Sequence, residues 1–178
     1  FLDPFGLIAA SALPDAVKVS LILELSDASG SRGMVAGQVL DMEGEHKQLT
    51  LAELQTIHAN KTGRLLAYPF ITAGLILELQ ADIAQLLKKI GKKLGLAFQV
   101  RDDILDLIAD FEALGKTPQK DLVAEKSTYP ALLGLEESKA LLTRELDACE
   151  DLLDQITATC EFDPQAIKKL IEGLRIDG

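Results

Sequence analysis

The sequence predicts an all-α protein that forms a single domain over residues 1–178. The chain is nearly half hydrophobic (48%) but poor in aromatic residues (4%), with no Trp, a composition typical of helical globular proteins. Apolar residues recur at every third or fourth position, and no segment shows the strict alternation of a half-buried strand. A chain of this length can bury one substantial core.

The predicted helices of the first half begin at Pro14 and Thr50. Proline suits the first turn of a helix, and the apolar pattern that Pro14 opens continues through Gly30, Gly33 and Gly37. Glycine lowers helix propensity, so three small residues on one face indicate close backbone packing or an approaching ligand. The run Thr50-Leu51-Ala52-Glu53 is a capping box, and it begins a helix expected to run toward residue 79, with Pro69 as a candidate kink.

The second half predicts three helices, with a break after the first. A long helix over residues 81–110 has apolar residues along one side. Residues 111–127 form the break, because they contain a glycine, a proline and three lysines. An amphipathic helix covers residues 136–159, and Asp163-Pro164, an N-cap followed by a first-turn proline, begins a last helix over residues 165–174.

Charge and cysteine content exclude several classes of function. A net charge of −10 repels phosphate backbones, so nucleic acid is not an expected partner. The two cysteines, Cys149 and Cys160, fit neither a CxxC motif nor a disulfide framework. The most apolar stretch, residues 65–77, is too short to span a bilayer. No secretory signal is evident, and we expect a cytoplasmic protein.

An acidic cluster within the long predicted helix is the strongest candidate site. Asp102, Asp103 and Asp106 fall within five residues, and Gln99 lies on the same face at helical spacing. Mg²⁺ relieves the repulsion between such carboxylates and typically binds through one or two of them plus phosphate oxygens. The pattern therefore predicts a magnesium–diphosphate site, although a solvated acidic helix face has the same spacing.

Other polar residues are weaker candidates taken singly. Gln38 and Asp41 lie three apart, which suits a cavity-facing pair or a helix-end cap. Lys61 and Thr62 share a helical face with His58, and a lysine beside a threonine can bind a phosphate through charge and one directed hydrogen bond. A solvated surface helix would carry the same residues. The loop lysines are Lys116, Lys120 and Lys126, which could cover a diphosphate or simply be solvated.

Taken together and in this order, the motifs resemble the trans-prenyltransferases, or polyprenyl diphosphate synthases. The resemblance covers nearly the whole chain and rests on five motifs: Gly37-Gln38 with Asp41, Lys61-Thr62-Gly63, Phe98-Gln99 with Asp102 to Asp106, Gly115-Lys116, and Lys126 to Pro130. The stretch over residues 127–134 is most similar to bacterial farnesyl diphosphate synthases. Their fold implies an all-α, isoprenoid-synthase-type helical bundle around a central cavity.

The resemblance also implies a reaction and a set of roles. Family members are homodimers that use Mg²⁺ to condense an allylic diphosphate (dimethylallyl or geranyl) with isopentenyl diphosphate, here giving farnesyl diphosphate. Asp102 corresponds to a metal ligand, and Asp103 and Asp106 to ligands or their support. The remaining correspondences are Lys61 and Lys116 on the allylic diphosphate, Thr62 and Gln99 near the reacting carbons, Gln38 and Asp41 as an inward-facing polar pair, and Lys126 as a further binding lysine.

The sequence departs from the family pattern in two respects. A second aspartate-rich motif and the basic residues that hold isopentenyl diphosphate, both upstream in the family, do not occur here. Phe1 aligns just after that motif, so we expect the N-terminal helices of the family to be missing. The chain is then the C-terminal portion of a polyprenyl synthetase domain, inactive alone although its longer parent is active. Gln119 stands where many relatives have glycine.

Three alternatives to a farnesyl diphosphate synthase remain open. The first is a synthase of longer products, such as geranylgeranyl diphosphate, because the residues that set product length lie near the missing motif. The second is a non-catalytic scaffold or regulatory paralogue. The third, a plain helical structural protein, gives no reason for an acidic face followed by a lysine loop.

Overall fold

The computed structural model describes residues 3–114 and 127–176, with side chains described up to residue 111 in the first range. Both ranges contain helices and no strand, which confirms the all-α prediction. The elements are α1 (Asp3–Ala10), α2 (Asp15–Ser29), α3 (Met34–Gly44), α4 (Leu51–His58), the π-helix η1 (Ala59–Gly63), α5 (Arg64–Ile76), α6 (Ala81–Leu114), α7 (Tyr129–Leu133), α8 (Leu135–Thr159) and α9 (Gln165–Leu174).

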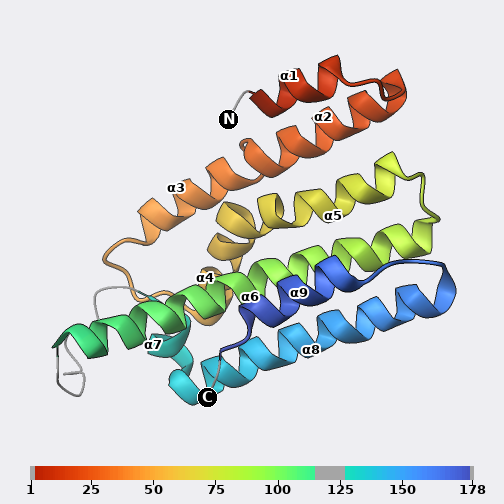
Figure 1. Ribbon diagram of the computed structural model, residues 1–178. Coiled ribbons are helices and arrows are strands. Elements are labelled where there is room, and N and C mark those ends of the chain that lie inside the picture. The colour runs from red at the N-terminus through yellow and green to blue at the C-terminus, as the bar shows by residue number, and fades with distance from the viewer. Residues whose placement is uncertain (1–2, 115–126, 177–178) are drawn as a thin grey trace.

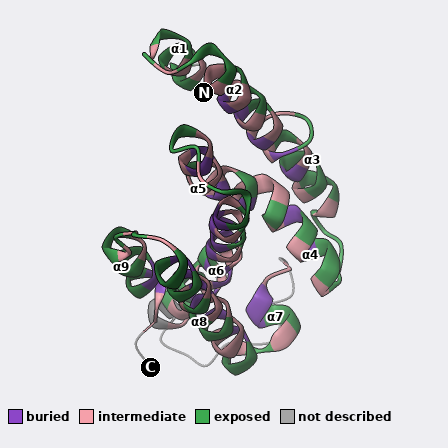
Figure 2. Cartoon of the chain, turned by 90° about the vertical axis from the view of Figure 1, so that its right-hand side faces the viewer, coloured by how far each residue is buried: buried purple, intermediate pink, exposed green. Residues whose placement is uncertain are grey.

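The helices stack in layers around α6 (Figure 1). α1 to α3 form one edge, α4 and α5 lie beneath them, α6 runs through the middle, and α8 and α9 form the opposite edge. The largest core lies between α6 and α8, where Ile90, Ala97 and Val100 of α6 and Leu146 and Leu153 of α8 are fully buried. Figure 2 shows the buried residues gathered on these facing sides. The core thereby fixes the direction of α6, the helix that carries the acidic cluster.

The edge formed by α2 and α3 is less buried than the core. α2 buries Leu21, Leu25 and Ala28, and α3 buries only Gly37. Several large apolar side chains on these two helices stay exposed: Val19, Leu23, Val35, Val39, Leu40 and Met42. None of the helices in the two described ranges is both long and apolar enough to cross a membrane.

The predicted helix through Gly30, Gly33 and Gly37 is wrong, because α2 ends at Ser29 and α3 begins at Met34. Gly30 and Gly33 make the break. A Cβ on Gly33 would lie 2.1 Å from the carbonyl oxygen of Ala28, and one on Gly30 would lie 2.4 Å from that of Ser26. The chain turns too tightly there for any side chain. Of the three glycines, only Gly37 serves the predicted close packing within a helix.

The predicted regular helix after Thr50 is interrupted by η1. The capping box itself is confirmed, since Thr50 accepts the Glu53 N–H and the Glu53 carboxylate accepts the Thr50 N–H at 2.7 Å. Between α4 and α5 the backbone takes the i→i+5 bond of a π-helix, with the Arg64 N–H donating to the Ala59 carbonyl. The irregularity therefore lies at residues 59–63, while Pro69 sits inside α5.

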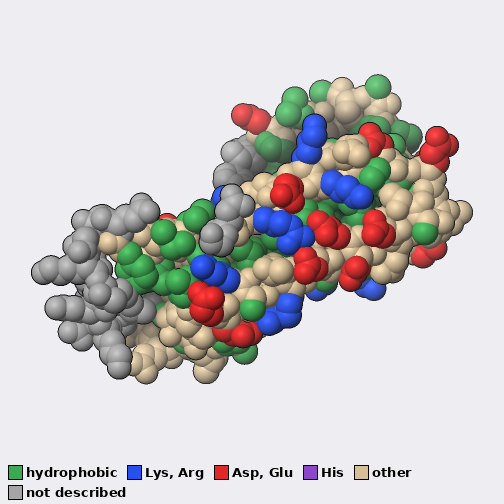
Figure 3. All heavy atoms as spheres, turned by 60° about the horizontal axis from the view of Figure 1, so that its bottom comes forward, with side chains coloured by type: hydrophobic (Ala, Val, Ile, Leu, Met, Phe, Trp, Pro, Cys, Tyr) green, Lys and Arg blue, Asp and Glu red, His purple; other side chains and the backbone are tan. Residues whose placement is uncertain are grey.

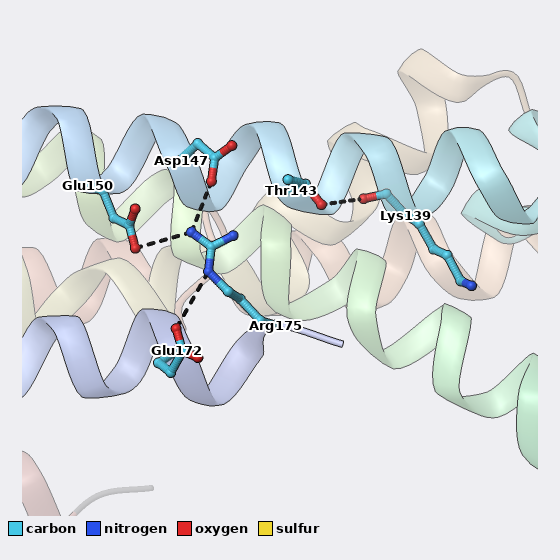
Figure 4. Close-up of polar contacts among 6 residues, drawn as sticks. All are labelled: Lys139, Thr143, Asp147, Glu150, Glu172 and Arg175. Carbon is cyan, nitrogen blue, oxygen red and sulfur yellow. Dashed lines mark hydrogen bonds and ion pairs between the residues drawn. The ribbon is translucent and has the colours of Figure 1, made fainter. Parts of the chain in front are cut away.

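The last two helices pair through an ion cluster around Arg175 (Figure 4). The Arg175 guanidinium lies 2.9 Å from Asp147 and 3.1 Å from Glu150 of α8, and 3.6 Å from Glu172 of α9. The predicted bounds of α9 are confirmed, but its N-cap is Pro164, and Asp163 lies one residue before it, where its carboxylate accepts the Gln165 N–H at 3.0 Å. On the described surface drawn in Figure 3, acidic and basic side chains are interspersed.

Candidate functional site

The predicted site residues lie on three adjoining elements. Gln38 and Asp41 are on α3, Lys61 and Thr62 are in η1, and Gln99 and the three aspartates are on α6. Lys116, Lys120 and Lys126, together with Gln119, fall outside the described residues. The structure thus bears on eight of the ten predicted site residues: Gln38, Asp41, Lys61, Thr62, Gln99, Asp102, Asp103 and Asp106.

α3 meets η1 at a glycine. An ideal Cβ on Gly37 would lie 2.1 Å from the backbone nitrogen of Lys61 and 2.5 Å from its Cα. The absence of a side chain lets the two backbones touch. One turn further along α3, the Asp41 carboxylate accepts a hydrogen bond from the Lys61 ammonium, with 2.5 Å between Oδ2 and Nζ. The contact therefore brings two of the predicted binding residues together.

Lys61 and Thr62 lie within the π-helical turn. Single π-turns inside α-helices occur frequently at functional sites, and this one changes the register between α4 and α5. The regular helix assumed in predicting a shared face for His58, Lys61 and Thr62 is therefore interrupted at residues 59–63. Both Lys61 and Thr62 are half-buried, and Lys61 faces α3.

A second glycine contact joins η1 to α6. An ideal Cβ on Gly95 would lie 2.9 Å from the Cα of Gly63, the last residue of η1. Gln99 follows Gly95 by one turn on the same face of α6. The Gly63–Gly95 contact thus holds the turn that carries Lys61 and Thr62 against α6, about two helical turns before Asp102.

The three aspartates differ in their surroundings. Asp102 and Asp106 are exposed and Asp103 is half-buried. Asp103 Oδ2 accepts the backbone N–H of Tyr129 at 2.9 Å. No hydrogen bond or ion pair joins Lys61 to Asp102 or Asp106 in the described part of the chain, which also contains no group of three acidic, His or Cys side chains placed to hold a metal.

This donor set fits Mg²⁺ only in part. Asp102 and Asp106 offer two exposed carboxylates four residues apart on one helix face, and Mg²⁺ commonly takes one or two carboxylates and fills its other positions with water and phosphate oxygens. The described residues therefore suit a magnesium ion shared with a phosphate ligand, and not one enclosed by protein groups alone.

The sequence did not predict that residues 127–129 connect the elements around the candidate site. Ser127 Oγ accepts the Leu49 N–H at 3.1 Å and donates to the Lys47 carbonyl at 3.3 Å. Thr128 caps α7 by accepting the Ala131 N–H at 3.2 Å, a signal visible in the sequence as a threonine before Tyr-Pro. The segment therefore ties the start of α4 to the acidic end of α6.

Tyr129 is the buried centre of this segment. Its side chain is 0% exposed, and its ring lies 5.5 Å from the ring of His58, tilted by 54°. Burial raises the pKa of the Tyr129 phenol, and the negative charges of Asp103 and Glu145 raise it further. The phenol is therefore neutral over the physiological range, and Tyr129 acts as a packing element between α4 and α6.

A cavity in the described structure is separate from these residues. It has a volume of about 710 Å³ and lies between α2, α4, η1, α5 and α6. Its charged lining residues are Glu24, Asp27, Arg64, Lys88 and Lys92, and none of the predicted site residues lines it.

Comparison with known proteins gives consistent matches. The family model described as "Polyprenyl synthetase" matches residues 7–169. The farnesyl diphosphate synthase of Micrococcus luteus is 50% identical over 151 residues, covering 85% of this chain and 52% of that protein. The farnesyl diphosphate synthase of Escherichia coli is 37% identical over 172 residues, covering 94% of this chain and 57% of that protein.

Solved structures with a similar fold include a putative farnesyl-diphosphate synthase and a geranyltransferase. A putative farnesyl-diphosphate synthase from Marinomonas sp. MED121 superposes with a TM-score of 0.79 at 32% identity, covering 96% of this chain and 57% of that one. A Helicobacter pylori geranyltransferase, solved in complex with magnesium and isoprenyl diphosphate, gives a TM-score of 0.75 at 30% identity, covering 96% and 55%. The chain spans about half the length of the curated relatives it matches.

Proposed function

Because this chain belongs to the polyprenyl synthetase family, we propose that it is the C-terminal portion of a prenyltransferase domain. The complete enzyme condenses dimethylallyl or geranyl diphosphate with isopentenyl diphosphate and forms farnesyl diphosphate. One observation carries this proposal beyond the resemblance. The Gly63–Gly95 contact brings η1, which carries Lys61, against α6 about two turns before Asp102, on a helix that exposes the carboxylates of Asp102 and Asp106.

Lys61 and the loop lysines bind the allylic diphosphate in this proposal. The ammonium of Lys61 is held by Asp41 and stabilises the negative charge that develops as the carbon–oxygen bond of the allylic diphosphate breaks. Gln38 completes the polar pair on α3, and Lys116 and Lys126 add further positive charge. The carboxylates of the 102–106 cluster would hold Mg²⁺, which supplies further neutralisation of the diphosphate when bound.

Thr62 and Gln99 stabilise the allylic carbon that becomes positively charged in the reaction. Their side-chain oxygens are dipoles that stabilise an allylic cation without reacting readily with it. The double bond of isopentenyl diphosphate then attacks that carbon and forms the new carbon–carbon bond. A proton leaves the resulting cation, and the departing diphosphate is a suitable base. No catalytic histidine is therefore needed.

We further propose that the enzyme is a cytoplasmic homodimer. The apolar side chains left exposed on α2 and α3 provide a surface that a second copy can cover. Cys149 and Cys160 are both free thiols, as expected in a reducing compartment. Isopentenyl diphosphate binds to residues upstream of this chain, so residues 1–178 alone do not turn over substrate.

The test is a product assay on a longer form that includes the N-terminal half found in the relatives. With Mg²⁺, geranyl diphosphate and labelled isopentenyl diphosphate it should give a fifteen-carbon product, whereas the 178-residue chain should give none. Lys61→Gln should lower kcat/KM by roughly 100-fold. The control Lys139→Gln, which removes an ion pair with the exposed Glu136, should leave the rate unchanged.

Two outcomes would contradict the proposal. The first is an inactive longer protein, which would favour a non-catalytic paralogue. The second is full activity of Lys61→Gln. A longer product would instead assign the enzyme to the chain-length alternative, as in the Arabidopsis thaliana geranylgeranyl pyrophosphate synthase 7, which is 36% identical over 168 residues.

A further inference from the structure

We propose that Asp103 is a positioning residue that anchors residues 127–129 to α6, and that Asp102 and Asp106 alone supply the metal-binding carboxylates of this helix. The inference rests on the proposed function and divides the acidic cluster into two roles. It starts from the hydrogen bond between Asp103 Oδ2 and the Tyr129 N–H, 2.9 Å long and joining residues 26 apart in sequence.

The backbone amides at the start of α7 show why an acceptor is needed at this place. The first N–H groups of a helix have no partner within it. The Thr128 side chain satisfies one of them by accepting the Ala131 N–H, and the Leu132 N–H makes the first bond within the helix, to the Thr128 carbonyl. Pro130 has no N–H. The Tyr129 N–H has no acceptor within α7, and Asp103 accepts it.

The position of Tyr129 makes this hydrogen bond costly to lose. Tyr129 is completely buried, and a buried N–H without an acceptor is strongly unfavourable. The Tyr129 ring packs on His58, the last residue of α4 before η1. Loss of the Asp103 acceptor would therefore loosen the link between α6 and the turn that carries Lys61.

The remaining two aspartates are arranged differently. Asp102 and Asp106 are exposed, four residues apart, and share a helix face. Two carboxylates together with phosphate oxygens are the usual protein contribution to a magnesium site. Asp103, in contrast, has one carboxylate oxygen committed to a main-chain amide and is half-buried against α7.

The experiment compares Asp103→Asn, Asp103→Ala and Asp102→Asn in the longer protein. Asparagine keeps an oxygen that can accept the Tyr129 N–H but removes the charge. In EDTA, Asp103→Asn should melt within about 2 °C of the wild type and Asp103→Ala at least about 4 °C lower. Asp102→Asn should keep the wild-type melting temperature, because its side chain is exposed.

Metal dependence supplies the second measurement. Two quantities are measured. One is the affinity for Mn²⁺ in the presence of inorganic diphosphate, followed by electron paramagnetic resonance, and the other is the Mg²⁺ concentration that gives half-maximal activity. A variant should change both quantities by a similar factor. Asp103→Asn should change both by less than about 3-fold, whereas Asp102→Asn should weaken both by at least about 10-fold. Asp103→Ala should lower kcat more than it changes the Mg²⁺ requirement.

Either of two results would overturn the inference. One is a Mn²⁺ affinity of Asp103→Asn reduced as far as that of Asp102→Asn. The other is an Asp103→Ala protein that melts like the wild type in EDTA. Failure of the proposed function looks different, because the wild-type protein would then make no product, while the melting temperatures in EDTA would still decide the anchoring role.

Discussion

Asp41 of α3 holds the ammonium of Lys61 across the contact between α3 and η1, with 2.5 Å between their charged atoms. The two side chains are 33% and 36% exposed, so solvent screens the pair and its contribution to stability is small, about 1 kcal/mol at most. Its larger effect is geometric. A flexible lysine side chain is restricted to one place before a ligand arrives, which lowers the entropy lost on binding.

Removing the carboxylate of Asp41 should therefore affect activity more than stability. We expect Asp41→Asn to lower kcat/KM for the allylic diphosphate roughly 10-fold, with a melting temperature within about 3 °C of the wild type. Steady-state kinetics and thermal melts check this. Asp15→Asn, at an exposed pair with Lys18, is the matched control. Equal kinetics for both variants would show that Asp41 does not position Lys61.

Replacing Gly37 with alanine should destabilise the protein. The new Cβ would lie 2.1 Å from the Lys61 backbone nitrogen, so α3 and η1 must separate, at a cost of about 1–3 kcal/mol. Gly173→Ala in α9 is the control, because nothing lies within 4 Å of that Cβ and alanine favours a helix by up to about 1 kcal/mol. Urea unfolding measures both. Similar free energies of unfolding would rule out the close backbone contact.

Neutralising Arg175 should loosen α9 in a salt-dependent way. Arg175→Gln removes the cation shared by Asp147, Glu150 and Glu172, and we expect a loss of about 1 kcal/mol at low ionic strength. The difference from wild type should shrink in 1 M NaCl, where the Debye length falls to about 3 Å and charge interactions are strongly screened. Lys139→Gln, on the same helix in Figure 4, should change little. A loss independent of salt would point to packing instead.

Cys149 should make the protein less stable at alkaline pH. Burial raises the pKa of the Cys149 thiol to about 12, so above pH 9 the unfolded state ionises while the folded state does not. This contribution to stability is complete below about pH 9 and is lost between about pH 9 and 12. Between pH 8 and 10 the wild type should lose about 1 kcal/mol more than Cys149→Ala. Urea unfolding measures the free energy of unfolding of both proteins at each pH. Equal losses for the wild type and Cys149→Ala would show that the Cys149 thiol does not cause the pH dependence.

Local sequence signals predicted most of the helices. The capping box at Thr50, the Asp163 acceptor and the apolar periodicity of α6 and α8 depend only on neighbouring residues. The glycine break after α2 was missed, because Gly30 and Gly33 continue a helical spacing in the sequence. Their role depends on how tightly the backbone turns, which residue type alone does not specify.

The residue types of the candidate site were predictable, but their partners were not. Carboxylates at helical spacing mark a possible metal site wherever they occur. The bond from the Tyr129 N–H to Asp103 has no such signature, since every residue except proline carries an amide. The Asp41–Lys61 pair likewise depends on Gly37 letting two helices touch. The roles of Asp102, Asp106, Thr62 and Gln99 stay predictions until the variants are measured.

The π-helical turn at residues 59–63 behaves as a single-residue insertion within an otherwise continuous helix. Deleting one residue there would restore ordinary α-helical pairing and make the segment locally more regular. It would also rotate everything before it by about 100° relative to α5, one residue's step in a helix of 3.6 per turn. His58 would swing away from Tyr129. Shortening this turn would therefore change which side of α4 faces α6. The irregular turn keeps both α4 and α5 packed against α6.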